Sequence, residues 1–378
     1  MANKMKKSED FTTALMKELS KNAYNYYVYN RDYDRFGRPS TTKSVKLFLE
    51  MILVFILKSL RLTVSKKRYR TDLKRIEEIE VYFGGLNNLY AQLNDENSKR
   101  TLVELVAYRI LGRHRVKLSL NNKSFWRKKK EVCNLLSGTQ TIPFINWKLH
   151  HFDLNAIGYN IELFNTQLGV LGIFILEQYK YDKCSKALQA EKDDFVIDAG
   201  GCWGDSALYF ANAVGEEGKV FSFEFIPSNL EIMARNIALN PHLKDRIEIV
   251  KKPLWDLSGK ALFCTNHGPG SRINENKPEG DFVTVSTVSI DDFARENKLK
   301  KIDFIKKDIE GAELSALRGA RNTIERFKPK LAISVYHNFA HFAEIPEFLN
   351  SLNFKYDFYL DHYTTHLEET VLYAIPRP

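Results

Sequence analysis

A glycine-rich turn between an apolar strand and a helix is the first stretch of this sequence whose residue types could bind a ligand. Residues 195–205 read FVIDAGGCWGD and are followed by the helical run SALYFANAV. The acidic and glycine positions of the turn are Asp198, Gly200, Gly201, Gly204 and Asp205. Such a turn leaves backbone N–H groups and the helix N-terminus beside a ligand, because no Cβ blocks the approach. A tight turn without a ligand is the alternative.

A second acidic residue follows at a distance that suits a cofactor. The strand VFSFE ends at Glu224, twenty residues after Gly204. An acid at this offset accepts hydrogen bonds from the ribose hydroxyls of adenosine-type cofactors. The turn and Glu224 together predict a cofactor site, to which we also assign Asp256, beyond the third strand.

The spacing of the turn distinguishes between cofactors. It reads D-x-G-x-x-x-G-D, whereas the dinucleotide fingerprint reads G-x-G-x-x-G. Asp198 would repel a pyrophosphate and attract an ammonium group. S-adenosylmethionine carries an amino group, a sulfonium and a ribose but no phosphate, so carboxylates at Asp198, Asp205 and Glu224 suit it. We therefore predict an S-adenosylmethionine site.

Three further polar residues are predicted to lie at the same edge of a sheet. The strand in IDFIKKDIEGAE is expected to end at Asp308, two residues before Glu310, and the strand KLAISVYH to end at His337. Methyl transfer to a hydroxyl requires removal of the hydroxyl proton and in-line placement of the methyl group. His337, with an ordinary pKa of about 6.5, is the predicted base. Asp308 and Glu310 are predicted to orient it, to bind sugar hydroxyls or to hold a divalent cation such as Mg²⁺.

These three residues also have a structural interpretation. The stretch D-I-E-G-A-E can begin a helix, where acidic side chains offset the positive end of the dipole. A single histidine is structural more often than catalytic, and the position of His337 at a strand end is what favours a role in the site.

The elements that must position these residues alternate between strands and helices from about residue 150. The strands VFSFE, IEIVKK, IDFIKKD and KLAISVYH are separated by helical stretches, one of which begins at Pro227 and Ser228. This alternation predicts an α/β fold with a mostly parallel sheet and helices on both faces. In such sheets, ligands bind at the carboxyl ends of the strands. The last two strands, FKYDFYLDH and EETVLYAI, have no helix between them, which predicts an antiparallel C-terminal strand at the edge.

Five stretches of residues 155–375 together resemble the FkbM-type family of S-adenosylmethionine-dependent methyltransferases. They are VIDAGGCWGDSALYFA, FEFIPSNLEIMARNIALN, DFIKKDIEGAELSALRGARNTI, KLAISVYH and ETVLYAI. The resemblance implies a class I methyltransferase (Rossmann-like) fold and O-methylation, often of sugars or polyketide-type natural products. It implies a cofactor motif at Asp198, Gly200, Gly204 and Asp205, a ribose acid at Glu224, and a D-x-E-G motif at Asp308, Glu310 and Gly311. One departure is Ile226 before Pro227, where the family commonly has an acidic residue.

Charge divides the 378 residues into two parts. Residues 1–150 hold 30 Lys and Arg against 14 Asp and Glu, and the remainder of the chain has a net charge of −7. We predict a basic, mainly helical region over 1–150 and the methyltransferase domain over 151–378. Four scattered cysteines without a C-x-x-C pair fit a reducing compartment. The first residues, MANKMKKSEDF, lack the apolar run of a secretory signal, so we expect a cytoplasmic protein.

Residues 43–62 are expected to form a helix with its charges on one side. The uncharged run, 51–57, is too short for a helix that spans a bilayer, which needs about 20 apolar residues. The basic residues Lys66, Lys67, Arg68 and Arg70 follow. An apolar face beside a basic cluster is typical of helices that lie on anionic lipid, here the inner membrane face. Burial of the same helix in its own domain or in a homodimer is the alternative.

The acceptor has several interpretations at this point. A sugar in a glycan or glycolipid is the expected one. A natural product is an alternative, and RNA is another because the first part of the chain is basic. Nucleic acid is disfavoured, since no recognised binding motif is present and D-I-E-G stands where base N-methyltransferases usually have N/D-P-P-Y. A non-catalytic S-adenosylmethionine-binding module would not need Asp308, Glu310 and His337.

Vesicle flotation separates the two interpretations of residues 43–70. Membrane contact predicts that the protein floats with anionic liposomes and not with neutral ones, since each basic residue near an anionic surface contributes about 1 kcal/mol. Changing Lys66, Lys67, Arg68 and Arg70 to Gln should then abolish flotation. If the protein is a monodisperse dimer that binds neither kind of vesicle, the helix would instead belong to an interface between subunits.

Overall fold

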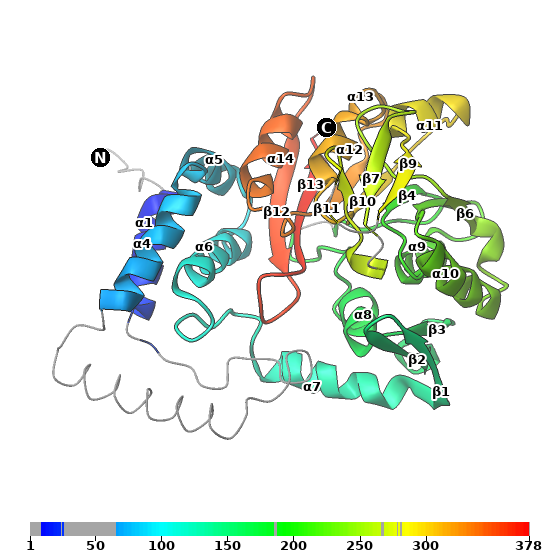
Figure 1. Ribbon diagram of the computed structural model, residues 1–378, viewed down its shortest axis with the longest axis horizontal. Helices are drawn as coiled ribbons and strands as arrows, with labels where there is room; N and C mark the ends of the chain where they lie inside the picture. Colours follow the sequence, from blue (N-terminus) through cyan, green and yellow to red (C-terminus); the bar gives the residue numbers. More distant parts are fainter. Residues whose placement is uncertain are drawn as a thin grey trace, which may run out of the picture. The chain divides into compact units, whose positions relative to one another are not determined.

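The computed structural model of the protein describes residues 9–23, 25, 66–184, 187–265, 268–277, 279 and 282–377. The chain forms two compact units (Figure 1). The first unit comprises residues 1–122 and 360–370, and the second comprises 123–359 and 371–378. The division of the chain into two domains at residue 150 stays a prediction.

The described residues of the first unit are mainly helical. Its helices are α1 (Phe11–Asn22), α4 (Lys66–Glu80), α5 (Phe83–Gln92) and α6 (Glu96–Leu111). Asp95 begins α6 as a cap, accepting a hydrogen bond from the Ser98 backbone N–H at 2.7 Å. The glycine pair Gly84 and Gly85 lies in the first turn of α5.

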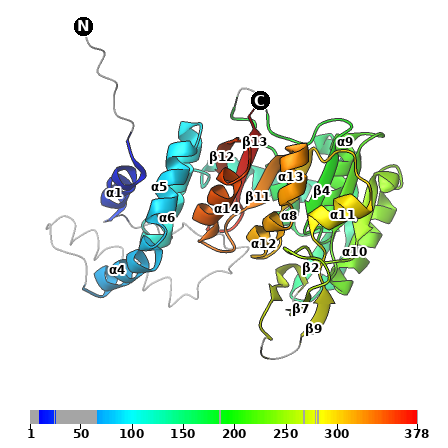
Figure 2. The ribbon, with the colours of Figure 1, turned by 90° about the horizontal axis from the view of Figure 1, so that it is seen from above.

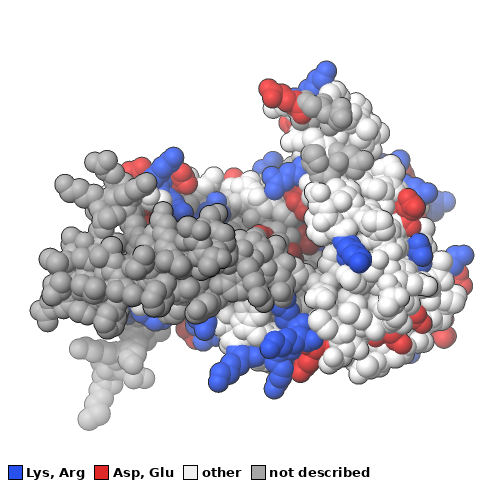
Figure 3. Space-filling model, turned by 60° about the horizontal axis from the view of Figure 1, so that its bottom comes forward, with Lys and Arg blue, Asp and Glu red and all other residues white. Residues whose placement is uncertain are grey.

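The predicted membrane contact falls largely outside the described residues. The helix expected at 43–62 is not among them, and Lys66 to Arg70 form the first residues of α4. In the described part of the chain, no helix is both long enough and apolar enough to span a bilayer. On the face shown in Figure 3, the described Lys and Arg side chains are interspersed with Asp and Glu. Contact with an anionic membrane therefore stays a prediction.

A seven-stranded sheet forms the centre of the second unit. Its strands are β4 (Phe195–Ala199), β5 (Lys219–Phe223), β6 (Ile247–Val250), β10 (Phe304–Lys307), β11 (Lys330–Ser334), β12 (Tyr356–His362) and β13 (Thr370–Pro376). They lie in the order β12-β13-β11-β10-β4-β5-β6. The five strands from β11 to β6 pair in parallel, whereas β13 pairs antiparallel with β11. The predicted antiparallel C-terminal strand is confirmed, but β12 and not β13 lies at the edge.

Helices alternate with these strands and flank the sheet (Figure 2). They are α9 (Asp205–Val214), α10 (Pro227–Leu239), α11 (Ile290–Glu296), α12 (Glu313–Arg318), α13 (Arg321–Phe327) and α14 (His341–Asn350). Because both faces of the sheet are covered, its strands are mostly apolar, and Val196, Ile305 and Ile333 are fully buried. This strand order with its intervening helices is the class I methyltransferase, Rossmann-like fold that the sequence predicts.

Smaller elements surround the central sheet. One three-stranded sheet holds β1 (Leu136–Phe144), β2 (Trp147–Asp153) and β3 (Glu162–Asn165), and another holds β7 (Ala261–Cys264), β8 (Ile273–Asn274) and β9 (Val283–Ser286). The helices α7 (Lys123–Glu131) and α8 (Gln167–Val170) precede and follow the first of these sheets. Single turns of 3₁₀ or π helix occur at Val132–Leu135, Asn155–Ile157, Leu171–Ile175, Lys244–Arg246 and Gly268–Gly270.

The turn between β1 and β2 supports a loop of the site. A Cβ on Gly268 would lie 2.8 Å from Ile145 Cδ1 and 2.9 Å from Phe144 Cε1, so the two segments touch. Phe144 also packs edge-on against Trp203 of the glycine turn, at 5.3 Å between ring centroids. The first small sheet thereby holds the loop at Gly268 and the turn after β4 in one cluster.

Candidate active site

A pocket lies at the carboxyl ends of β4, β5, β6 and β10. The residues that follow these strands line it, together with the loop 268–273, and it encloses about 540 Å³, part of it open to solvent. The strand order changes direction between β4 and β10, since β5 follows β4 on one side and β11 follows β10 on the other. Ligands of open α/β sheets bind at this kind of position.

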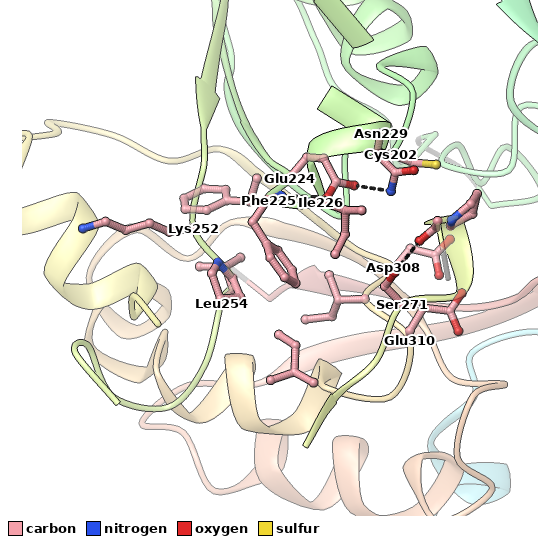
Figure 4. A pocket seen from close by; sticks show the side chains of 17 residues that line it. Cys202, Glu224, Phe225, Ile226, Asn229, Lys252, Leu254, Ser271, Asp308 and Glu310 are labelled. Atoms are coloured by element: carbon pink, nitrogen blue, oxygen red, sulfur yellow. Dashed lines mark hydrogen bonds between the residues drawn. The ribbon is translucent and has the colours of Figure 1, made fainter. Parts of the chain in front are cut away.

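Glu224 and Asn229 form one polar end of the pocket (Figure 4). The Glu224 carboxylate accepts hydrogen bonds from the backbone N–H groups of Phe225 and Ile226 at 2.6 and 2.7 Å, and from Asn229 Nδ2 at 3.1 Å. Asn229 Oδ1 is buried and has no hydrogen-bond partner among the described residues. Burial raises the pKa of Glu224, and the hydrogen bonds, which lower it, only partly offset this increase. Two adjacent acceptors thus face the pocket, an arrangement that suits a pair of hydroxyls.

Apolar side chains form the neighbouring walls. Ile226 and Leu254 follow β5 and β6, and Ile309 follows β10. A flat aromatic base can pack between such side chains, as apolar linings with few polar groups are typical of cofactor sites. An adenosine group, with its base here and its ribose at Glu224 and Asn229, fits these residues.

The glycines of the turn lie against other segments of the chain more than against the pocket. Gly200 has φ of +92°, and a Cβ there would lie 1.9 Å from the backbone oxygen of Asp308. A Cβ on Gly201 would lie 2.2 Å from Ser222 Oγ, and one on Gly204 would lie 3.0 Å from Met233 Cγ. We expected these glycines to admit a ligand. In the structure they admit neighbouring strands and helix α10, and Gly200 alone of the three lines the pocket.

Asp198 and Asp205 are buried beneath the turn. Asp198 forms an ion pair with Lys306 at 3.1 Å and accepts a hydrogen bond from Ser222 Oγ at 2.6 Å. Burial would lower the pKa of Lys306, but the charges of Asp198 and Asp308 raise it above its ordinary value. Asp205 accepts a hydrogen bond from Asn165 Nδ2 at 2.7 Å. The cation that Asp198 was predicted to meet is therefore a lysine of the chain, and neither acid lines the pocket.

Asp256 is also not part of the lining. It lies against the junction of α12 and α13, where a Cβ on Gly319 would approach its Cα to 3.0 Å. Of the predicted cofactor residues, the structure thus brings Gly200 and Glu224 to the pocket.

The three predicted acceptor residues do lie together. Asp308 and Glu310 also line the pocket and lie below Glu224 and Asn229 in the view of Figure 4. The side chain of His337 is 4% exposed, and its Nε2 lies 3.6 Å from Asp308 Oδ1 and 3.5 Å from Glu310 Oε2. Glu310 and Gly311 have φ of +56° and +106°, a sharp turn after β10. The three side chains therefore lie close together, as the shared edge of the strands predicts.

The structure adds Glu313, which the sequence did not single out. Glu313 is fully buried at the start of α12, and its Oε1 lies 2.8 Å from His337 Nδ1. The backbone N–H groups of Ile309 and Gly311 donate to the same oxygen. His341 Nδ1 lies 3.3 Å from Glu313 Oε2. The third acid of D-I-E-G-A-E and the second histidine of HNFAH were the available signals for these two residues.

The carboxylates around His337 control its protonation. Burial would lower the pKa of His337, but Glu310, Glu313 and Asp308 outweigh it and raise the pKa to about 11. Burial likewise raises the pKa of Glu313, but His337 and His341 bring it well below the usual range. At neutral pH the imidazole therefore carries a proton, unlike the ring with an ordinary pKa that the sequence suggested. It must lose that proton before it can act as a base.

Two tyrosines orient Asp308. The hydroxyls of Tyr179 and Tyr336 donate to Asp308 Oδ2 and Oδ1 at 3.2 and 3.3 Å. Burial raises the pKa of Asp308, and the charge of His337 opposes this increase. The carboxylate is thus fixed between two hydroxyls while one edge faces the pocket.

Part of the chain is similar to known proteins. Residues 198–356 match the family model described as "Methyltransferase FkbM domain". A protein of Beauveria bassiana named "Methyltransferase 1" is 27% identical over 167 residues, 39% of this chain and 66% of that protein. "Hexuronic acid methyltransferase AglP" of Haloferax volcanii is 26% identical over 137 residues, 36% of this chain and 54% of that protein. The chain spans about two thirds of the first relative and about half of the second.

A solved structure overlaps with a larger share of the chain. The structure of "Methyltransferase FkbM" from Methylobacillus flagellatus KT has a TM-score of 0.49 and 19% identity. The overlap covers 79% of this chain and 60% of that one.

The close approach of Gly200 to Asp308 can be tested by the stability of a variant with a larger residue at position 200. Gly200→Ala should reduce the free energy of unfolding by about 2–5 kcal/mol, because it combines a strained φ with a clash against backbone. Gly259→Ala is the matched control, since Gly259 has φ of +77° but nothing within 4 Å of an added Cβ. It should cost only about 1–2 kcal/mol. Urea unfolding of both variants measures the difference, and equal losses would contradict the close contact.

Proposed function

Because residues 198–356 belong to the methyltransferase FkbM domain family, we propose that this protein transfers the methyl group of S-adenosylmethionine to a hydroxyl group of a sugar. The observation that carries the proposal is a single pocket with two different polar ends. One end presents Glu224 and Asn229, and the other presents Asp308 and Glu310. A donor and an acceptor can meet between these ends.

The donor end accounts for the nucleoside. Glu224 and Asn229 Oδ1 would accept hydrogen bonds from the two ribose hydroxyls, and the apolar walls would hold the adenine. S-adenosylmethionine, when bound, supplies an electrophilic methyl group on a sulfonium. The chain itself contributes orientation and exclusion of water, because reaction requires the acceptor oxygen and the methyl group to be held in line.

The acceptor end accounts for the hydroxyl. Asp308 and Glu310 can accept hydrogen bonds from sugar hydroxyls, and together with His337 they form the group through which the reacting proton leaves. The choice of a sugar is supported by the name of the Haloferax volcanii relative, a hexuronic acid methyltransferase. A natural product or RNA is the alternative acceptor, and a cofactor-binding module without catalysis is the alternative class.

Glu224→Gln tests the donor end. The change keeps the size of the side chain but removes the charge that strengthens hydrogen bonds from two hydroxyls, each worth about 1.5–3 kcal/mol. We expect S-adenosylmethionine to bind about 10- to 100-fold more weakly by isothermal titration calorimetry. Glu217→Gln, at an exposed position beyond α9, should bind as the wild type does. Failure of the wild type to bind, or unchanged affinity in Glu224→Gln, would contradict the assignment.

Asp308→Asn tests the acceptor end. We expect turnover to fall about 10²- to 10⁴-fold, because a group that binds or deprotonates the hydroxyl is lost. Affinity for S-adenosylmethionine should change less than about 3-fold. This combination is the pattern of a lost transition-state contact. The measurement is S-adenosylhomocysteine released with hexuronic acids, neutral hexoses or transfer RNA, with Mg²⁺ and Mn²⁺ present.

The acceptor panel also decides between the alternatives. Methylation of a hexuronic acid or hexose supports the proposal. Methylation of transfer RNA alone overturns the choice of a sugar. Binding of S-adenosylmethionine without transfer to any acceptor of the panel favours the non-catalytic module.

A further inference from the structure

We propose that a divalent transition-metal cation binds between His337 Nε2 and the carboxylates of Asp308 and Glu310, with Glu313 as the residue that positions the histidine ring. Binding of the cation is independent of the proposed methyl transfer. A role of the cation in catalysis rests on the proposed function. The sequence suggested a cation at Asp308 and Glu310 through oxygen ligands alone. The structure adds an imidazole nitrogen, which changes the kind of cation.

An unsatisfied nitrogen is the first observation. His337 Nε2 is buried and makes no hydrogen bond within the described part of the chain. Its side chain is almost fully buried, and leaving a buried polar atom without a partner is unfavourable. The atom points between two carboxylates, which are acceptors and metal ligands. A ligand that bridges all three would satisfy it.

The distances around Nε2 suit shared coordination. Asp308 Oδ1 and Glu310 Oε2 lie 3.6 and 3.5 Å from it, which is longer than an ordinary N–H···O hydrogen bond. Two atoms each about 2.1 Å from one cation lie about 3.4 Å apart at a tetrahedral angle and about 3.0 Å apart at a right angle. Each carboxylate oxygen therefore lies about as far from Nε2 as two ligands of one cation lie from each other. Ligand atoms of Asp308, Glu313 and His337 also lie within 4.8 Å of one another.

Glu313 holds the ring in the orientation that a metal ligand needs. Its Oε1 accepts from His337 Nδ1 at 2.8 Å, which directs Nε2 toward Asp308 and Glu310. Histidines that bind metals commonly donate their other ring N–H to a carboxylate, and this contact fixes the tautomer. Glu313 is itself fixed by backbone donors of the turn after β10. The contact that a metal-binding histidine needs at its other ring nitrogen is therefore already present.

Charge at this end of the pocket also favours a cation. Three carboxylates surround His337, and the nearby cations are engaged elsewhere or lie farther away. Lys306 pairs with Asp198 at 3.1 Å, and Arg272, whose side chain is 58% exposed, reaches Glu310 only at 3.9 Å. A divalent cation that displaces the ring proton would offset the remaining negative charge.

The donor set selects the class of cation. Carboxylates alone suit Mg²⁺, whereas an imidazole ligand favours Mn²⁺, Zn²⁺ and other transition metals. Asp308 and Glu310 line the pocket, so the remaining coordination positions would face an acceptor hydroxyl there. A cation in that place lowers the pKa of a bound hydroxyl and orients it.

Manganese titration of the full-length protein tests the site. After dialysis against EDTA, free Mn²⁺ is followed by electron paramagnetic resonance. We expect one saturable site per chain that Mg²⁺ displaces only weakly. Glu313→Gln should weaken Mn²⁺ binding about 10- to 100-fold, as loss of an outer contact does, and Glu310→Gln and His337→Gln should weaken it further. Glu347→Gln, an exposed position on α14, should bind as the wild type does.

The outcomes separate this inference from the proposed function. Absence of a saturable Mn²⁺ site, or wild-type affinity in His337→Gln, overturns the metal site; retained S-adenosylmethionine binding shows that a variant is folded. Mn²⁺ binding without methylation of any hydroxyl supports the metal site and overturns the function. Full turnover after EDTA treatment overturns a catalytic role of the cation.

Discussion

The buried ion pair between Asp198 and Lys306 is the interaction on which the arrangement of this site depends. Both residues are at most 1% exposed, and they join β4 to β10, where the strand order changes direction. Lys306 Nζ also donates to the backbone oxygen of Gly200 at 2.7 Å, and Asp198 accepts from Ser206 and Ser222 on α9 and β5. Breaking a buried pair by removing one partner typically costs about 3–5 kcal/mol. Four elements around the pocket therefore meet at one pair of charges.

The position of the acceptor residues follows from this junction. The Gly200 turn packs against the backbone of Asp308, so the chain beyond β10 must leave sideways through Glu310 and Gly311, both at positive φ. That turn directs Glu310 toward His337 and brings Glu313 beneath the ring. The position of Asp308 and Glu310 in the pocket thus depends on one contact between the ends of the neighbouring strands β4 and β10.

The sequence predicted the sheet and the rim of the pocket because these depend on local patterns. Apolar runs that end in acids mark the strands, and the carboxyl ends of parallel strands share one edge, so Glu224, Asp308, Glu310 and His337 could be placed. Boundaries were less accurate. β11 ends at Ser334 rather than His337, and α12 begins at Glu313 rather than near Glu310.

What the sequence could not predict are contacts between residues distant in the chain. Asp198 and Lys306 are 108 positions apart, and no local pattern shows that a lysine of the chain meets the acid expected to face the ligand. The contact of Glu313 with His337 is missed for the same reason, and with it the high pKa of the ring. The sequence predicts a basic, mainly helical region over 1–150, yet residues 136–153 form the hairpin that supports the pocket.

The differing environments of the carboxylates indicate which of them can bind a ligand. Asp198 is neutralised by Lys306, and Glu313 by two histidines and two backbone N–H groups. Glu224 has backbone donors but keeps lone pairs toward the pocket. Asp308 accepts hydrogen bonds from two tyrosine hydroxyls, and the ion pairs of Asp308 and Glu310 with His337 and Arg272 are 3.5 Å or longer. Asp308, Glu310 and Glu224 line the pocket whereas Asp198 and Glu313 do not, so these three are the carboxylates that a ligand in the pocket can reach.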